Sequence, residues 1–275
     1  MRGSIGAGAK AIGITAVVIW SVAPFAWQLL TSLKPLGELY QVPPTLWSFA
    51  PSAEAYTQVF SARPFHRYVI NSVVVAGATT AIVLLLGGLA GYALARLRFP
   101  GRQAIRWVIL MVAMFPPIAL VSPLFVLFSR LGVLDTYAAL ILPYAVFALP
   151  LGTWILASYF AEIPREIEEA ALVDGCTPTQ ALWKVLLPLA GPGLATAGIL
   201  VFIYAWNEFL FALAFTSSNA ARTVPVAIAL FPGLHEFPWG EIAAASILVT
   251  APVILLVAIL QRRIVRGLTV GATTG

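Results

Sequence analysis

PREIEEAALVDGCTPTQALWKVLLPLAGP, residues 164–192, is a polar segment between two long apolar runs. We therefore expect it to form a loop at a membrane surface. Four acidic residues crowd into one expected helix: Glu166, Glu168, Glu169 and Asp174. Ala170 and Ala171 would leave a shallow, close-packing face on that helix. A structured loop of this size at a membrane face predicts a docking surface for another protein.

The local signals in this loop predict two short helices joined by a turn. Acidic residues near the start of Glu166–Val173 suit the positive end of a helix dipole, and Gly175 can supply the left-handed residue that closes the helix. Thr177 and Gln180 have the spacing of a capping box, with Pro178 at the first helical position. The second helix is expected to continue to Pro188.

The composition excludes an ordinary soluble domain. Of 275 residues, 60% are hydrophobic and 10% are charged, whereas soluble domains carry about a quarter charged residues. The single Cys176 excludes an internal disulfide framework, and with His66 and His235 it forms no metal site. The net charge of +5 includes no basic run of the kind that nucleic acid requires, so we attribute it to membrane topology.

Charge-free runs predict six transmembrane helices, because about 20 apolar residues cross a ~30 Å hydrocarbon layer. Pro188 and Pro192 move the start of the fifth span to Gly193. The expected spans are 11–33, 69–95, 107–129, 136–160, 193–216 and 242–262. The runs do not alternate, so they exclude β-barrel strands. We expect an all-α integral membrane protein, a single transmembrane domain over 1–275, with a helix–turn–helix loop at 161–192 between spans four and five.

The first span begins like a signal peptide, with Arg2 and Lys10 ahead of an apolar run. That run is longer than the ~7–15 residues of a signal peptide and has no small-x-small cleavage site, so we predict an uncleaved span.

Lysine and arginine counts predict the orientation. With both termini in the cytoplasm, the inner segments hold 11 of these residues and the outer segments hold 5. The positive-inside rule selects this topology and places the loop 161–192 in the cytoplasm. The outer segments are then 34–68, 130–135 and 217–241.

The spacing of the loop resembles the EAA loop of importer-type ABC transporter permeases. Glu169-Ala170-Ala171, three residues, Gly175, nine residues and Val185-Leu186-Leu187-Pro188 follow the family pattern EAA-x3-G-x9-I-x-LP, with valine in place of isoleucine. Further segments are similar to the carbohydrate-uptake branch: Asp174-Gly175, Met114–Pro117, Trp206–Phe209 and Arg266–Gly271. The chain looks closest to the maltose-type second permease subunit, and the resemblance covers nearly all of it.

The resemblance implies that the loop contacts a cytoplasmic ATPase subunit. The residues that it assigns to this coupling are Glu166, Glu169, Ala170, Ala171, Asp174, Gly175, Leu187 and Pro188. It also implies a second homologous permease, two copies of the ATPase, an extracytoplasmic sugar-binding protein and the cytoplasmic (inner) membrane of a bacterium or archaeon. Substrate would move inward by alternating access.

The chain offers no route of its own to ATP. Its lysines are Lys10, Lys34 and Lys184, and none of them follows a glycine in a GxxxxGK[ST] phosphate loop. No Ser/His/Asp set forms a plausible catalytic constellation either. We therefore expect a membrane subunit that is not an enzyme, with no cofactor of its own and with ATP and Mg²⁺ bound by the partner ATPase.

Four residues are candidates for the translocation path. Glu208 is the one carboxylate expected inside a span, where a charge costs about 2.5–3.5 kcal/mol on insertion scales and so calls for a partner. It could make a structural contact across the permease interface or bind substrate, and Asn207 could bond a neighbouring helix or a sugar hydroxyl. Pro116 and Pro117 should kink span three, either at the path or for packing alone.

Other interpretations stay open at this point. The loop could be a solvated hairpin that merely connects two spans. The cargo could be a glycerol phosphate ester or a polyol. The protein could also be an ion-coupled secondary carrier, although such carriers usually show paired intramembrane acids or broken-helix repeats, or it could be a scaffold that transports nothing. Outer loop 216–241 could contact the binding protein or form a short interfacial helix.

Overall fold

The computed structural model describes the backbone of residues 2–233 and 237–270, and side chains within 10–233 and 237–259. The described residues are helical, with connecting turns and no strand. Four helices are long and apolar enough to cross a membrane: α1 (Arg2–Ser32), α4 (Phe65–Arg96), α7 (Tyr137–Glu162) and α14 (Trp239–Val270). Two bent helix pairs raise this number to as many as six. The predicted all-α membrane fold is confirmed. The tail motif at 266–271 lies outside the described side chains.

The first bent pair consists of α5 (Arg102–Met114) and α6 (Ile118–Leu131), which meet at 92°. Pro116 and Pro117 occupy the break between them, and Pro117 is the N-cap of α6. Because proline has no backbone N–H, it cannot continue the hydrogen-bond ladder of α5. The kink expected in span three is therefore a bend of nearly a right angle, 92°.

The second bent pair joins the segment Pro178–Leu189 to α11 (Gly191–Trp206) at 76°. The fifth predicted span, 193–216, is not one helix either. It breaks after Trp206, and a separate short helix, α12 (Leu210–Phe215), follows. The remaining short helices are α2 (Leu36–Leu39), α3 (Glu54–Ser61), α8 (Arg165–Val173), α9 (Pro178–Ala181), α10 (Leu187–Leu189) and α13 (Val224–Ala229).

The chain forms two compact units, residues 1–66 with 227–252 and residues 67–226 with 253–275. In the first unit, Arg63 lies over the ring of Phe231 at 4.3 Å, and its Nε is 3.6 Å from Glu241 Oε2. The hydroxyls of Ser32 and Tyr56 lie 2.8 Å apart and tie the end of α1 to α3.

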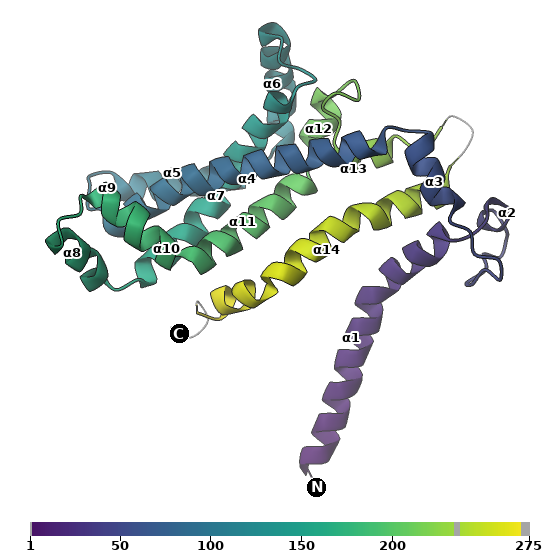
Figure 1. Cartoon of the computed structure of the whole chain (residues 1–275), viewed down its shortest axis with the longest axis horizontal. Helices are drawn as coiled ribbons and strands as arrows, with labels where there is room; N and C mark the ends of the chain where they lie inside the picture. The colour runs from purple at the N-terminus through teal and green to yellow at the C-terminus, as the bar shows by residue number, and fades with distance from the viewer. Residues whose placement is uncertain (1, 234–236, 271–275) are drawn as a thin grey trace. The chain divides into compact units, whose positions relative to one another are not determined.

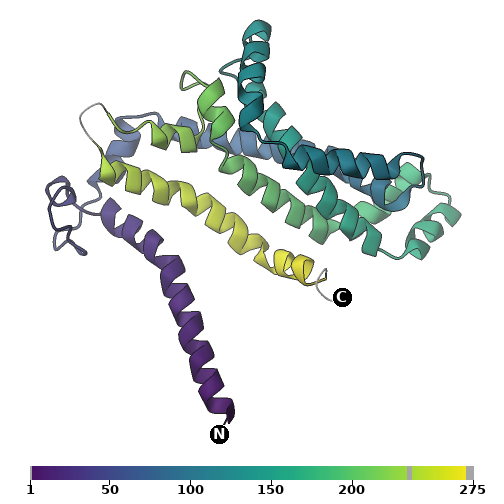
Figure 2. The same ribbon diagram turned by 180° about the vertical axis from the view of Figure 1, so that it is seen from behind.

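The second unit is built on the close packing of α4, α7 and α11. A Cβ added to Gly91 would lie 2.9 Å from the backbone nitrogen of Ala157, and one added to Gly193 would lie 2.4 Å from the ring of Tyr159. Only glycine permits these approaches, as is common between membrane helices. The segment α8–α10 lies at one end of these three helices (Figure 1 and Figure 2). Its apolar side chains join their core, which includes Tyr92, Leu156, Phe160, Leu182, Leu186, Ala190 and Ala197.

Candidate functional site

The loop 161–192 folds as the two-helix hairpin that its sequence predicts. α8 begins after Pro164 and ends at Asp174, and Gly175 follows with a φ of +88°, in the left-handed region that favours glycine. The capping box is present: Gln180 N donates to Thr177 Oγ1 (3.3 Å), and Thr177 N donates to Gln180 Oε1 (2.9 Å). These local contacts fix where each helix of the hairpin starts and stops.

The second helix of the hairpin is not a continuous α-helix. A π-helical turn, Leu182–Leu186, separates α9 from α10, and the N–H of Leu187 donates to the carbonyl of Leu182. Pro188 explains this turn, because a helical proline leaves the carbonyl four residues earlier without a donor and clashes with it. The extra residue in the turn lets the helix pass through the proline.

The residues assigned to ATPase coupling divide into separate groups. Five of them are exposed on α8 and its end: Glu166, Glu169, Ala170, Asp174 and Gly175. Ala171 is buried, so its methyl group faces the protein and not a free surface. Val173, which the motif does not single out, is 86% exposed and adds an apolar side chain to this exposed surface. We call the exposed surface of α8 and its end the free face.

Leu187 and Pro188 lie away from α8, in the second helix of the hairpin. Leu187 packs against the apolar core, while Pro188 is exposed. Both residues line an apolar cavity of about 520 Å³ together with Leu84 and Leu89 of α4 and Leu194 of α11. Their place in the fold connects the hairpin with the long helices.

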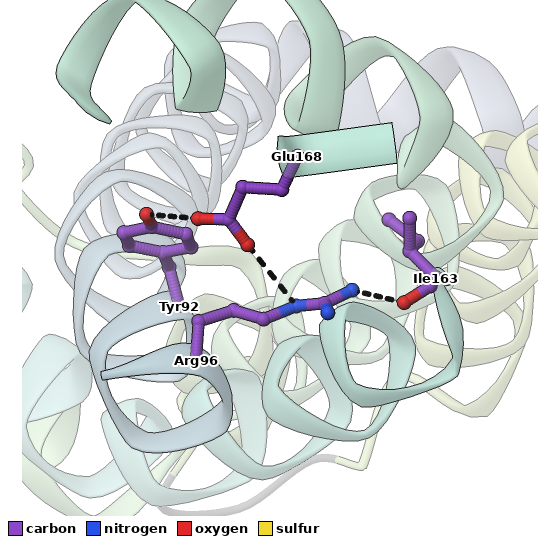
Figure 3. Close-up of polar contacts among 4 residues, drawn as sticks. All are labelled: Tyr92, Arg96, Ile163 and Glu168. Atoms are coloured by element: carbon purple, nitrogen blue, oxygen red, sulfur yellow. Dashed lines mark hydrogen bonds and ion pairs between the residues drawn. The ribbon is translucent and has the colours of Figure 1, made fainter. Parts of the chain in front are cut away.

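A polar cluster ties α8 to the end of α4, as Figure 3 shows. The hydroxyl of Tyr92 donates to Glu168 Oε1 at 2.7 Å, and Arg96 Nε lies 3.8 Å from Glu168 Oε2. Arg96 Nη2 donates to the carbonyl oxygen of Ile163, which is the C-cap of α7. We call these four residues the Arg96 cluster. Arg96 therefore joins α4, the end of α7 and α8 through one guanidinium group.

The ion pair of this cluster is largely buried. The side chain of Arg96 is 4% exposed and that of Glu168 is 16% exposed. Within residues 10–233 and 237–259, Glu168 is the one carboxylate within 4 Å of this guanidinium. In the sequence, Arg96 is one of the eleven positive residues assigned to the inner segments, and Glu168 is one of the four acidic residues of the expected helix. The i, i+4 spacing of Tyr92 and Arg96 hints at a shared partner, but the partner itself is visible only in three dimensions.

A second polar cluster lies near the start of α4 and involves Asn71, Tyr137, Asn219 and Arg222. The hydroxyl of Tyr137 donates to Asn71 Oδ1 at 2.7 Å, and Asn71 Nδ2 donates to the carbonyl of Arg222 at 2.9 Å and to that of Asn219 at 3.4 Å. Arg222 Nη1 donates to Asn219 Oδ1 at 3.2 Å. This Asn71 cluster fixes the segment 217–223 against α4 and α7.

Glu208 and Asn207 occupy the break between α11 and α12. The carboxylate of Glu208 accepts hydrogen bonds from Phe211 N (3.0 Å) and Ala212 N (3.3 Å), the first free N–H groups of α12. Asn207 Nδ2 donates to the carbonyl of Ile203 at 2.8 Å. Both side chains therefore stabilise the break in their own segment. These contacts within the chain favour a structural role, while the predicted contact across the permease interface stays a prediction.

Pro116 and Pro117 are separate from that pair in sequence and lie at the α5–α6 bend. An apolar cavity of about 350 Å³ lies beside the bend and is lined by α5, α6 and α7, including Met111, Phe115, Leu120 and Phe147. None of the hydrogen bonds described above joins this bend to Asn207 or Glu208. The four candidate residues for the path thus lie at two separate breaks, one between α5 and α6 and the other between α11 and α12.

The comparisons with known proteins agree with this geometry. The family model for the binding-protein-dependent transport system inner membrane component matches residues 83–270, which include α8–α11 and both bends of the fifth span. This chain belongs to that family. The predicted permease of an ABC importer is confirmed, as is its assignment to a multi-pass inner-membrane protein.

Relatives of this permease align over nearly their whole length. The chain is 46% identical to the trehalose transport system permease protein SugB of Mycobacterium tuberculosis, over 95% of each chain. It is 45% identical to the sulfoquinovosyl glycerol transport system permease protein SmoH of Agrobacterium fabrum, over 96% of this permease and 93% of the relative. It is 41% identical to the trehalose/maltose permease MalG of Thermococcus litoralis, over 96% and 95%.

A solved structure shows the same fold. The chain of a bacterial ABC transporter for the import of alginate superimposes with a TM-score of 0.81 at 22% identity, covering 94% of this permease and 96% of that chain. The helices described here, including the broken ones, therefore belong to a known membrane architecture.

Proposed function

We propose that this permease moves a di- or oligosaccharide inward by alternating access, driven by ATP hydrolysis in a separate ATPase subunit. The relatives named for trehalose, for trehalose and maltose, and for a sulfoquinovosyl glycerol support a carbohydrate cargo. ATP and Mg²⁺ would bind to the ATPase. Two copies of it, a second homologous permease and an extracytoplasmic sugar-binding protein would complete the importer.

The observation that carries this proposal is the free face of α8. Val173 is 86% exposed and Leu172 is 42% exposed, on a helix that lies outside the apolar core. An exposed apolar patch rimmed by charged residues is typical of a protein–protein contact. Here the rim is acidic, from Glu166, Glu169 and Asp174, and would suit basic side chains around a cleft. Ala170 leaves room for the close approach of such a partner.

The orientation follows from the same proposal. α8 lies on the side that the positive-inside rule assigns to the cytoplasm, so both termini would be cytoplasmic as well. When the two ATPases close on ATP, they would carry the α8 helices of the two permeases with them. Rigid-body motion of the helices would then open the path outward, and hydrolysis would reset it inward.

The breaks at Pro116–Pro117 and at Asn207–Glu208 are our candidates for the translocation path. Irregular backbone at membrane depth is tolerated where it lines a cavity or is buried in protein. The carboxylate of Glu208 is already held by two N–H groups of α12, which supports a role in shaping the path and argues against direct sugar binding. Asn207 is exposed next to it and is the better candidate for a sugar contact.

Reconstitution tests the transport proposal. The permease, its partner permease, the ATPase and the binding protein are assembled in liposomes, and uptake of radiolabelled trehalose and maltose is followed with and without ATP. Uptake that requires every subunit is expected. Uptake by this permease alone would instead indicate an ion-coupled carrier. Glycerol phosphate and a polyol serve as competing cargoes.

Site-directed cross-linking tests the docking face. In the Ala170→Cys variant, a short bifunctional reagent is expected to join the permease to the ATPase in the assembled complex; this variant and its control also carry Cys176→Ala, because Cys176 is a free thiol in the same hairpin. Phe49→Cys is the matched control, because Phe49 is 97% exposed and lies in a segment proposed to be extracytoplasmic. Absence of the Ala170→Cys product in a complex that still imports sugar would contradict the docking face.

A further inference from the structure

We infer that Glu168 is the positioning residue through which movement of α8 reaches the long helices of this permease. The inference rests on the proposed function, because it assumes that an ATPase moves α8. It adds a defined mechanical connection: the carboxylate of Glu168, held by Tyr92 and Arg96, transmits displacement of α8 to α4 and to the end of α7. Glu168 lies directly before Glu169-Ala170-Ala171, and its carboxylate faces α4.

α8 has few other attachments to the protein. Ala171 is its one buried residue, and a single methyl group provides little apolar contact. The second helix of the hairpin differs, because Leu182 and Leu186 are buried in the core shared with α4, α7 and α11. The chain connections at the two ends of α8 would allow the helix to tilt or slide. α8 also packs against the second helix of the hairpin, and the contacts of Glu168 add its direct attachment to α4.

Each carboxylate oxygen of Glu168 has its own partner on α4. Tyr92 donates to Oε1 at 2.7 Å, while Arg96 Nε lies 3.8 Å from Oε2 (Figure 3). The ring of Tyr92 is itself fixed edge-to-face against Phe160 of α7, with the ring centroids 5.9 Å apart. Because the hydroxyl of Tyr92, which donates a hydrogen bond, and the guanidinium of Arg96, which forms an ion pair, both lie on α4, one turn apart, the carboxylate resists displacement along that helix as well as away from it.

Burial makes the pairing of Arg96 with Glu168 obligatory. A guanidinium group that is 4% exposed needs an acidic partner, because breaking a buried pair leaves an uncompensated charge. Arg96 also donates to the carbonyl of Ile163, where α7 ends and the hairpin begins. Displacement of Glu168 therefore pulls on α4 and α7 together. Such a connection favours movement of these helices as one rigid body.

The central experiment compares Glu168→Gln with Glu162→Gln in the complete importer reconstituted in liposomes. Glu162 is exposed at the end of α7 and provides the same loss of one negative charge, six residues away. The measured quantity is the number of sugar molecules imported per ATP hydrolysed. For Glu168→Gln we expect a fall of about fivefold or more, within the range by which single residues modulate coupling between sites. Basal ATPase activity and assembly are expected to be retained, and Glu162→Gln should match the wild type.

A second variant tests whether misfolding explains the loss of coupling, since Glu168→Gln leaves the charge of Arg96 buried without a partner. The double variant Arg96→Gln with Glu168→Gln removes both charges, so it should assemble normally but remain poorly coupled. In a third variant, Tyr92→Cys with Glu168→Cys, a short bifunctional reagent replaces the polar contact by a covalent one. Treatment with the reagent is expected to restore import per ATP toward the wild-type value.

The outcomes separate the two proposals. If the Ala170→Cys variant does not cross-link to the ATPase and the wild-type importer does not import sugar with ATP, the proposed function fails. If the Ala170→Cys variant cross-links and the wild type imports sugar with ATP, but the Glu168→Gln and double variants import as much sugar per ATP as the wild type, the inference about Glu168 is overturned. Parallel loss of basal ATPase activity and assembly in both variants would also overturn it, because the residue would then serve folding alone.

Discussion

The two ends of α4 are anchored by opposite kinds of chemistry. In the Arg96 cluster, one buried ion pair attaches a nine-residue helix that has a single buried residue of its own. In the Asn71 cluster, the neutral amide of Asn71 donates hydrogen bonds to backbone carbonyls of the segment 217–223, and its oxygen accepts one from the hydroxyl of Tyr137. The first attachment concentrates its free energy in one charge pair, whereas the second spreads it over several hydrogen bonds, of which only the one from Arg222 to Asn219 has a charged donor.

This difference suggests that the attachments at the two ends of α4 serve different roles. A concentrated attachment holds one element firmly and fails as a unit when either charge is lost. A distributed attachment loses one bond at a time, because each neutral hydrogen bond contributes only about 1 kcal/mol. The first suits a helix that must transmit force, and the second suits a loop that must keep its shape. Substitutions at the two ends of α4 can test this contrast.

The largest effect is expected from Arg96→Ala. The substitution leaves the carboxylate of Glu168 without its cation and the carbonyl of Ile163 without its donor. Breaking a largely buried pair in this way should lower the free energy of unfolding by about 3 kcal/mol. Denaturation in detergent micelles, followed by tryptophan fluorescence, measures the loss. Arg98→Ala removes an exposed charge two residues away and should change stability little. Equal effects of the two variants would contradict the contrast.

Asn71→Ala is expected to have the next largest effect. Asn71 is 1% exposed, and its removal leaves the carbonyl of Arg222 and the hydroxyl of Tyr137 without their partner. Unsatisfied neutral groups of this kind should cost about 2 kcal/mol in the same denaturation assay. Gln103→Ala is a suitable control, since this amide side chain is exposed. A loss larger than that of Arg96→Ala would reverse the proposed ranking of the two ends.

Tyr92→Phe sharpens the comparison within the Arg96 cluster. It removes the hydroxyl that donates to Glu168 but retains the ring that packs against Phe160. The ion pair remains, so we expect a loss of about 1 kcal/mol. The control is Tyr159→Phe, because the hydroxyl of Tyr159 is buried and has no hydrogen-bond partner among the described residues. That control should be neutral or slightly stabilising, and a loss as large as that of Tyr92→Phe would show that the contact with Glu168 contributes nothing.

The smallest effect concerns Asp135, whose carboxylate accepts hydrogen bonds from Ser217 N (3.1 Å) and Ser218 N (3.2 Å) near the Asn71 cluster. Burial raises the pKa of Asp135, but the hydrogen bonds from Ser218 and Ser217 outweigh burial and hold this pKa below its ordinary value. The contribution of Asp135 to stability is therefore fully present above the unfolded-state pKa of about 4, and it is lost as the pH falls through the lower pKa of the folded protein.

Between pH 8 and pH 5, the segment 217–223 should thus keep its position. A fluorescent probe on Ala220→Cys, in a variant whose Cys176 is replaced by alanine, measures this, and its signal should stay constant over that range and change only below about pH 4. In Asp135→Asn, the neutral side chain has lost the charge, so the signal below pH 4 should no longer change through this residue. A transition of the probe between pH 5 and pH 8 would show that another group controls the segment.

Comparison of sequence and structure is most informative in the hairpin. The spacing of Thr177, Pro178, Gln180 and Gly175 predicts its helix ends, because capping and left-handed closure depend on residues within one turn. The π-helical turn before Pro188 was missed, since a proline alone does not reveal how the helix accommodates it. The burial of Ala171 was missed as well, because α8 is too short for periodicity to distinguish its two faces.

The membrane helices show the same limit. Pro116 and Pro117 predict the break between α5 and α6, but they do not predict its angle of 92°. The break after Trp206 carries no proline, and the carboxylate of Glu208 stabilises it by accepting hydrogen bonds from N–H groups of α12. A single carboxylate in an apolar run is visible in the sequence, whereas the group that it binds is not.

By itself, the sequence determined the membrane class, the family motif and the ends of the hairpin helices, because hydropathy, charge and capping act over short stretches of chain. Tertiary structure alone decided that Glu168 meets Tyr92 and Arg96, that Ala171 faces inward, and that Asn71 holds the segment 217–223. Those pairings join residues that are some 70 to 150 positions apart. Such contacts depend on how the helices pack, and no local pattern of residues encodes that packing.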